Sequence, residues 1–129
     1  MPASAKSVLI LMSVTGGGHL ATALALRSAF DKLYGAQFHI DIVDLLVDHT
    51  PWPFKNFPES YRFAMDHTPW LNGLTYHAAR NRVTAKSLMW ASYEMVRKPV
   101  AKVVEQYAPD LVIVVHPLLL TVPMRVVRD

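Results

Sequence analysis

The pattern of hydrophobic positions at the start of the chain predicts a strand, a helix and a second strand. Residues 7–13 form a short apolar run typical of a strand buried on both faces, and a cluster of glycines follows it. An amphipathic helix is expected over 19–34, with Gly35 as its C-terminal cap. Its inward-facing stripe is predicted to consist of Leu20, Ala23, Leu24, Phe30 and Leu33.

Alternating apolar residues over 38–44 predict the second strand. A strand, a helix and a strand joined by short connections form a βαβ unit, in which the crossover is right-handed and the two strands are parallel.

The rest of the chain has helical patterns interrupted by a segment rich in proline and aromatic residues. Residues 45–58 contain three prolines, which disrupt helices and central strands, so a long loop is expected there. Helical patterns occupy three further stretches, 59–67, 71–81 and 84–107. Pro99 should kink or restart the longest of these helices. Residues 111–115 predict a third strand, and a last helix should begin near Leu119. We therefore expect an α/β fold, a Rossmann-like parallel sheet with flanking helices.

One five-residue sequence occurs twice. Asp-His-Thr-Pro-Trp spans residues 48–52 and again residues 66–70. Repeat folds are built from longer units in several copies, so these two segments do not indicate a solenoid or a propeller. Two interpretations stay open: the recurrence is coincidental, or Trp52 and Trp70 share a task.

Composition excludes several classes of protein. The 129 residues are 52% hydrophobic and 18% charged, which is incompatible with a disordered chain and leaves ample material for a core. The chain has no cysteine, so disulfides, thiolate metal sites and thiol nucleophiles are excluded. We expect neither a signal peptide nor a transmembrane helix, because no apolar stretch approaches the roughly 20 residues that span a bilayer.

The positive charge is concentrated in one part of the chain. The net charge is +3, and residues 80–102 hold six Lys and Arg residues against one Glu. Such a window either attracts phosphates of lipid or nucleic acid, or forms a solvated helix face. Nucleic acid is not expected as a partner, because the aromatic and basic residues occupy separate stretches and do not interleave.

Candidate chemistry lies after the first strand, at Gly16, Gly17, Gly18 and His19. Ligands of open α/β sheets bind outside the carboxyl ends of the strands, where glycines and a helix N-terminus let backbone N–H groups contact an anionic or hydroxyl-bearing ligand. The sequence matches neither a P-loop nor the dinucleotide fingerprint. A neutral imidazole at His19 can serve as a general base toward a substrate hydroxyl.

His116 follows the third strand, where it either faces the same crevice or packs in the core. No metal site is expected from the spacing of the histidines.

A second candidate segment contains Trp52, Pro53 and Phe54, next to Lys55. Tryptophan at a membrane interface buries its ring while its N–H stays in contact with water. The segment either anchors the protein at a membrane or forms a small core under the loop. Together with the basic window and Arg125, it supports the hypothesis of a peripheral contact with anionic lipid.

Three segments of the chain together resemble a known family. They are residues 8–19, which end in Gly-Gly-Gly-His, residues 48–54 with Asp-His-Thr-Pro-Trp-Pro-Phe, and residues 116–125, which begin with His-Pro and end in Arg. In this order and spacing they resemble monogalactosyldiacylglycerol synthases and the related processive diacylglycerol glucosyltransferases. The resemblance covers nearly the whole chain. It implies an inverting glycosyltransferase of the two-domain GT-B type, which moves galactose or glucose from a UDP-sugar to diacylglycerol at a membrane surface. The UDP-sugar is then a co-substrate, and no further cofactor is implied.

The resemblance also implies roles for individual residues. His19 matches the family's general base. Trp52 and Pro53 match a loop implicated in binding anionic lipid, and Arg125 matches an arginine that is a candidate for contacting a lipid phosphate. Plant members carry Asp and Arg where this chain has Val14 and Leu20.

By the same resemblance, residues 1–129 are an incomplete N-terminal domain that holds the lipid acceptor and the membrane contacts, without the donor-binding C-terminal domain. The expected location is peripheral, on the cytoplasmic face of a membrane. The implied partners are diacylglycerol, anionic membrane lipid, and either a second copy of the chain or a separate donor-domain chain. We expect the isolated chain to bind lipid without catalysing transfer. The alternatives are a non-catalytic lipid-binding module and a Rossmann-like protein that binds a nucleotide on its own.

Overall fold

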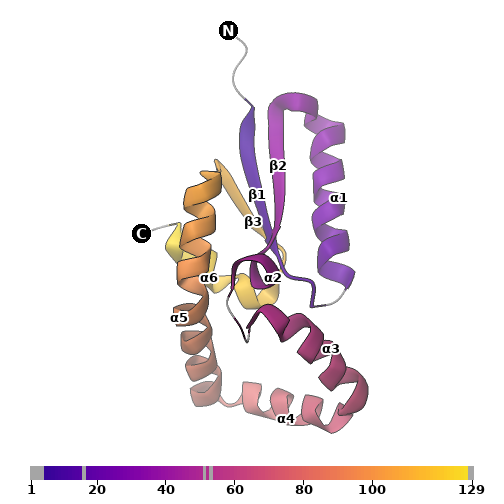
Figure 1. Cartoon of the computed structure of the whole chain (residues 1–129), viewed down its shortest axis with the longest axis vertical. Coiled ribbons are helices and arrows are strands. Elements are labelled where there is room, and N and C mark those ends of the chain that lie inside the picture. Colours follow the sequence, from indigo (N-terminus) through magenta and orange to yellow (C-terminus); the bar gives the residue numbers. More distant parts are fainter. Residues whose placement is uncertain (1–4, 16, 51, 53, 128–129) are drawn as a thin grey trace.

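A three-stranded parallel sheet lies at the centre of the structure (Figure 1). The computed structural model describes residues 5–15, 17–50, 52 and 54–127. The strands are β1 (Lys6–Met12), β2 (Phe38–Asp44) and β3 (Leu111–Val114), in the order β2-β1-β3. Central β1 is buried from Val8 to Met12, which explains its unbroken apolar run. The predicted βαβ unit, the third strand and the α/β fold class are confirmed.

Helices cover both faces of this sheet. Their bounds are α1 (Gly17–Tyr34), α2 (Leu45–His49), α3 (Phe57–His67), α4 (Pro69–Arg80), α5 (Arg82–Tyr107) and α6 (Thr121–Val126). The side chains of β1 alternate between the faces: Val8 and Ile10 pack with Ala23 of α1, whereas Leu9 and Leu11 pack with α5. α3 and α4 extend past the carboxyl ends of the strands, and α4 is the outermost helix at that end (Figure 1).

The region expected to be a long loop contains more helix than its prolines suggest. α2 occupies Leu45–His49, before the first proline, and a 3₁₀ turn follows at Phe54–Asn56. Asp44 begins α2 as its N-cap, because its Oδ1 accepts a hydrogen bond from Val47 N–H at 3.0 Å. The helix ends before Pro51 because a residue that precedes proline disfavours the helical conformation, and Thr50 is extended, with φ −110° and ψ 146°. The expectation of a continuous loop was therefore wrong.

Two further expectations about helices were wrong in part. Of the two outcomes expected at Pro99, a kink or a restart, the restart does not occur, because α5 continues as one helix through Pro99. In α1, the predicted stripe residues Leu20, Leu24 and Leu33 are exposed by 37%, 51% and 73%. Ala23 and Phe30 of the predicted stripe do pack in the cluster on the sheet, together with Leu26. These three residues are spaced i, i+3 and i+7 and form a narrower line along the helix.

Candidate functional site at the carboxyl edge of the sheet

The structure brings His19 and His116 together at the carboxyl ends of the strands. His19 lies in the first turn of α1, and His116 lies just after β3, which pairs with β1. Their ring centroids are 4.4 Å apart, with the ring planes tilted by 49°. His116 is 3% exposed, whereas His19 is partly exposed. Partly exposed His19 is therefore accessible to a ligand, and buried His116 packs against its ring from the side of the core.

Thr15 holds the buried histidine. Its Oγ1 and Nε2 of His116 are 2.6 Å apart and share a hydrogen bond between residues 101 positions apart in the chain. This bond links the loop after β1 to the segment after β3. A hydrogen bond to one ring nitrogen restricts the tautomer and the orientation of an imidazole. Thr15 therefore fixes how His116 presents its ring to His19.

Asp44 positions the loop that carries Thr15. Its Oδ2 accepts a hydrogen bond from Val14 N–H at 2.9 Å, while its other oxygen caps α2. One carboxylate thus joins the end of β1 to the end of β2 and the start of α2. Asp44 was not predicted as a site residue, although an Asp between a strand and an apolar segment is a recognisable N-cap signal.

The environment of His116 favours its neutral form. Burial lowers the pKa of His116 below the ordinary histidine value of 6.5, the neighbouring imidazole of His19 lowers this pKa further, and the carboxylate of Asp44 acts in the opposite direction. A neutral His116 adds no positive charge beside His19. An imidazolium that forms on His19 therefore meets a neutral neighbour.

This lowered pKa predicts a loss of stability in acid. Because folding favours neutral His116, the unfolded chain binds more protons once the pH falls below 6.5. The free energy of unfolding should therefore decrease as the pH falls from neutral toward the pKa of the folded state. We expect His116→Gln to remove part of this decrease, measured by urea unfolding at pH values between about 7 and 5. An identical pH dependence in wild type and variant would contradict the burial of a neutral His116.

The glycines lie differently from the expected loop. Gly17 and Gly18 form the first turn of α1, and a Cβ added to either would meet no atom within 4 Å. The space beside them is open, and the first N–H groups of a helix have no partner within the helix. This turn therefore has room for an oxygen-rich ligand next to His19. Gly16 lies outside the described residues.

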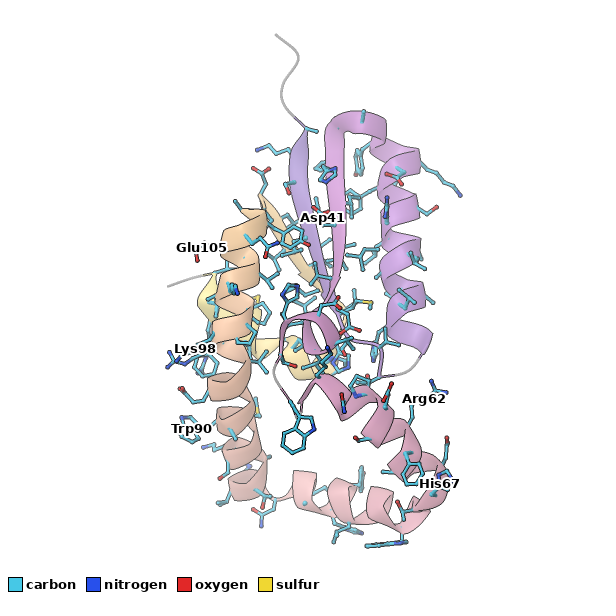
Figure 2. The ribbon with its side chains drawn as sticks, in the orientation of Figure 1. Asp41, Arg62, His67, Trp90, Lys98 and Glu105 are labelled. Carbon is cyan, nitrogen blue, oxygen red and sulfur yellow. The ribbon has the colours of Figure 1, made fainter. Side chains whose placement is uncertain are left out.

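Arg125 lies in a hollow between α5 and α6. Its guanidinium is 5.2 Å from the centroid of the Tyr93 ring, a cation–π distance. The hollow has a volume of about 230 Å³ and is lined by Lys86, Met89, Trp90, Tyr93 and Arg125. Trp90 projects from α5 away from the sheet (Figure 2) and is 67% exposed. The two cations of this hollow can pair with an anionic group, and its aromatic and thioether side chains can contact an apolar chain attached to that group. The basic window indicated Lys86 only as part of a charged stretch, and neither Trp90 nor Tyr93 was expected here.

The predicted membrane segment is described only in part. Trp52 is 78% exposed, the largest exposure among the large hydrophobic residues that the structure describes. Pro53 and the side chain of Phe54 lie outside the described part of the chain. At Trp52, the interpretation of a small core under the loop does not hold, because the ring faces solvent.

The described part of the chain contains neither a cluster of metal ligands nor a membrane-spanning helix. Within them, no three His, Cys, Asp or Glu side chains lie close enough to hold a metal ion. No helix in the same part of the chain is both long and apolar enough to cross a bilayer.

The fold and the site together define a class. A parallel sheet whose first strand leads through a glycine turn into a helix, with polar side chains gathered at the carboxyl edge, is a Rossmann-like α/β domain, and open α/β sheets in general bind ligands at that edge. The family is shown by comparison with known proteins. The family model described as Monogalactosyldiacylglycerol (MGDG) synthase matches residues 19–129, so the chain belongs to the MGDG synthase family.

Individual relatives agree with this assignment. Monogalactosyldiacylglycerol synthase 1, chloroplastic, of Arabidopsis thaliana is 44% identical over 125 residues, which cover 96% of this chain and 23% of that protein. Monogalactosyldiacylglycerol synthase, chloroplastic, of Spinacia oleracea is 42% identical over 127 residues, which cover 98% of this chain and 24% of that protein. The chain thus spans about a quarter of the length of these curated relatives. No solved structure is significantly similar to it.

Proposed function

We propose that this chain forms the lipid-acceptor side of a glycosyltransferase that moves galactose or glucose from a UDP-sugar to diacylglycerol. The observation that carries the proposal is the contact of His19 with His116 at the carboxyl edge of the sheet, within the segment that the family model matches. A partly exposed imidazole beside an open glycine turn is suited to receive a hydroxyl group. The donor nucleotide is then held by a part of the enzyme that this segment does not span.

In the proposed reaction, His19 is the general base. It takes the proton from the free hydroxyl of diacylglycerol while that oxygen attacks the anomeric carbon of the donor sugar. The new carbon–oxygen bond forms as the bond to UDP breaks, the bonding electrons leave with UDP, and the anomeric centre inverts. His116 and Thr15 act as positioning residues, because they hold a neutral ring against the imidazole that becomes charged.

The same proposal assigns the protein to the surface of a membrane. Exposed Trp52 is suited to enter the interface, and the hollow of Arg125 and Lys86 is suited to hold the phosphate of an anionic lipid. Attachment would be peripheral, on the cytoplasmic face of the membrane. The two relatives described above are chloroplastic by name.

Arg125→Ala should weaken binding of this chain to anionic vesicles about fivefold, the effect of roughly 1 kcal/mol for one cation near a charged bilayer. Co-sedimentation with vesicles of equal parts anionic and zwitterionic phospholipid measures the effect. Arg27→Ala is the matched control, since Arg27 is an exposed arginine on α1. Equal binding by wild type and both variants would refute the role of the Arg125 hollow in lipid binding.

A further inference from the structure

The repeated five-residue sequence builds a similar local structure in both places. In the first copy, α2 ends at His49, and the hydroxyl of Thr50 donates a hydrogen bond to the carbonyl four residues earlier. In the second copy, α3 ends at His67, and the hydroxyl of Thr68 donates to the carbonyl four residues earlier at 2.7 Å. Both threonines are C-cap residues. The recurrence of the sequence is therefore matched by a recurrence of structure.

Each copy ends a helix and presents a tryptophan. The threonine hydroxyl bonds back to the helix, and the proline after it disfavours the helical conformation at the threonine, so the helix stops. The tryptophan that follows is exposed in both copies, by 78% at Trp52 and by 69% at Trp70. Neither ring contributes to the core, although tryptophan is among the largest apolar surfaces that a side chain can bury. The copies differ at the tryptophan, because Trp70 is the second residue of α4 whereas Trp52 lies in a turn.

The surroundings of Trp70 match a negatively charged lipid surface. Trp70, Leu74 and His77 are spaced i, i+4 and i+7 along α4, which places them on one stripe, and all three are exposed. Leu74 is 58% exposed. From residue 67 to residue 93 the chain has three cations and no acidic residue; the cations are Arg80, Arg82 and Lys86. Two exposed apolar side chains on one helix stripe, followed in the sequence by positive charge, have the composition of an interfacial helix face.

The position of α4 in the fold is consistent with a membrane contact. α4 is the outermost helix beyond the carboxyl ends of the strands, the edge at which His19 and His116 meet (Figure 1). A lipid whose hydroxyl reaches His19 has to approach from the membrane that holds its acyl chains. A membrane contact at this end of the molecule places the acceptor near the proposed base.

We propose that the two copies are paired membrane anchors, in which Trp70 and Leu74 of α4 enter the headgroup region of an anionic bilayer alongside Trp52. This inference rests on the proposed membrane contact of Trp52 and extends the contact surface to α4. The occupant is a bilayer because the N–H of an indole that stays in contact with water, together with the three cations and the absence of acidic residues between positions 67 and 93, matches lipid phosphates and glycerol.

Single-tryptophan variants test the proposal, because the chain has three tryptophans. The Trp70-only chain carries Trp52→Phe and Trp90→Phe, and the Trp52-only chain carries Trp70→Phe and Trp90→Phe. The control chain replaces all three by Phe and adds Leu33→Trp, since Leu33 is 73% exposed at the far end of α1, away from α4 (Figure 1). Each is mixed with vesicles of equal parts anionic and zwitterionic phospholipid whose acyl chains are brominated, and quenching of the indole fluorescence is recorded.

We expect quenching in the Trp70-only and Trp52-only chains and none in the Leu33→Trp control. Trp70→Ala should also weaken partitioning about tenfold, the effect of losing roughly half the burial of an aromatic side chain. Quenching of Trp52 without Trp70 would overturn the inference and leave the proposed function standing. Failure of the wild-type chain to bind the vesicles would overturn both. Equal quenching in the Leu33→Trp control would show that the chain has no oriented contact and would also refute the inference. Because Trp70 is exposed, unchanged thermal unfolding of the variants is expected.

Discussion

His19→Ala, introduced into an MGDG synthase that carries this segment, is expected to reduce hexose transfer to diacylglycerol by roughly 10²–10⁴-fold, the usual contribution of a general base. Alanine has no group that can accept the hydroxyl proton, and His116 cannot replace it because His116 is buried. Transfer from a UDP-sugar to diacylglycerol in mixed vesicles measures the loss. Binding to anionic vesicles should be retained, since His19 is separate from the proposed lipid contacts.

His39→Ala provides the matched control for this prediction. His39 is an exposed histidine at the start of β2, the end of the strand remote from the carboxyl edge. Its only described ion pair is with Asp41, at 3.4 Å. The His39 variant should transfer hexose like the wild type. Near-normal transfer by the His19 variant would refute its role as the base.

Asp44→Ala is expected to lower the free energy of unfolding by about 1–3 kcal/mol and to reduce transfer as well. The range combines the loss of an N-cap with the loss of a hydrogen bond to a charged acceptor. Without the carboxylate, Val14 N–H and Val47 N–H both lose their described partner. The loop that carries Thr15 is then no longer tied to the end of β2, and the His116 ring loses its fixed orientation.

Urea unfolding of the chain measures the stability, and Asp41→Ala is the control on the same strand. Asp41 lies in the middle of β2 (Figure 2), and its described polar contact is with the exposed side chain of His39. A surface ion pair of this kind contributes about 0–1 kcal/mol, so the control should differ little from the wild type. Equal stabilities for the two variants would contradict the linking role of Asp44.

The βαβ unit could be predicted from the sequence because its signals are local and agree with one another. The apolar run of β1, the glycines after it and the alternation of β2 each indicate one structure. α2 was missed because the nearby prolines favoured the interpretation as a loop. The helix is only five residues long, Leu45–His49, and it therefore fits entirely before Pro51. The inward stripe of α1 was predicted too broadly, since only the line through Ala23, Leu26 and Phe30 reaches the sheet.

The site was predicted in parts. His19 could be selected because it follows the glycines, and His116 because it follows a strand. That the two meet depends on β3 lying beside β1, and the order of strands in a sheet is set by long-range packing. The bond between Thr15 and His116 joins residues 101 positions apart and left no local signal. The hollow at Arg125 likewise depends on α6 packing against α5, which no periodicity within either helix specifies.

The structure adds one observation to the two interpretations of the repeated sequence. Two matching segments of five residues were compatible with coincidence. The structure gives both copies the same helix end, the same threonine bond and an exposed tryptophan. Similar local physics therefore produces a similar surface feature twice, which is what a shared task requires.

The proposed acceptor role is tested most directly by recording the imidazole signals of His19 and His116 by NMR while lipid is added to this chain. Anionic bilayer discs that contain diacylglycerol are compared with discs that contain triacylglycerol, which has the same acyl chains and no free hydroxyl. We predict that diacylglycerol shifts the His19 signals, and through the ring contact those of His116, whereas triacylglycerol leaves them unchanged. Signals that respond equally to both lipids, or to neither, would contradict the proposal that His19 receives the acceptor hydroxyl.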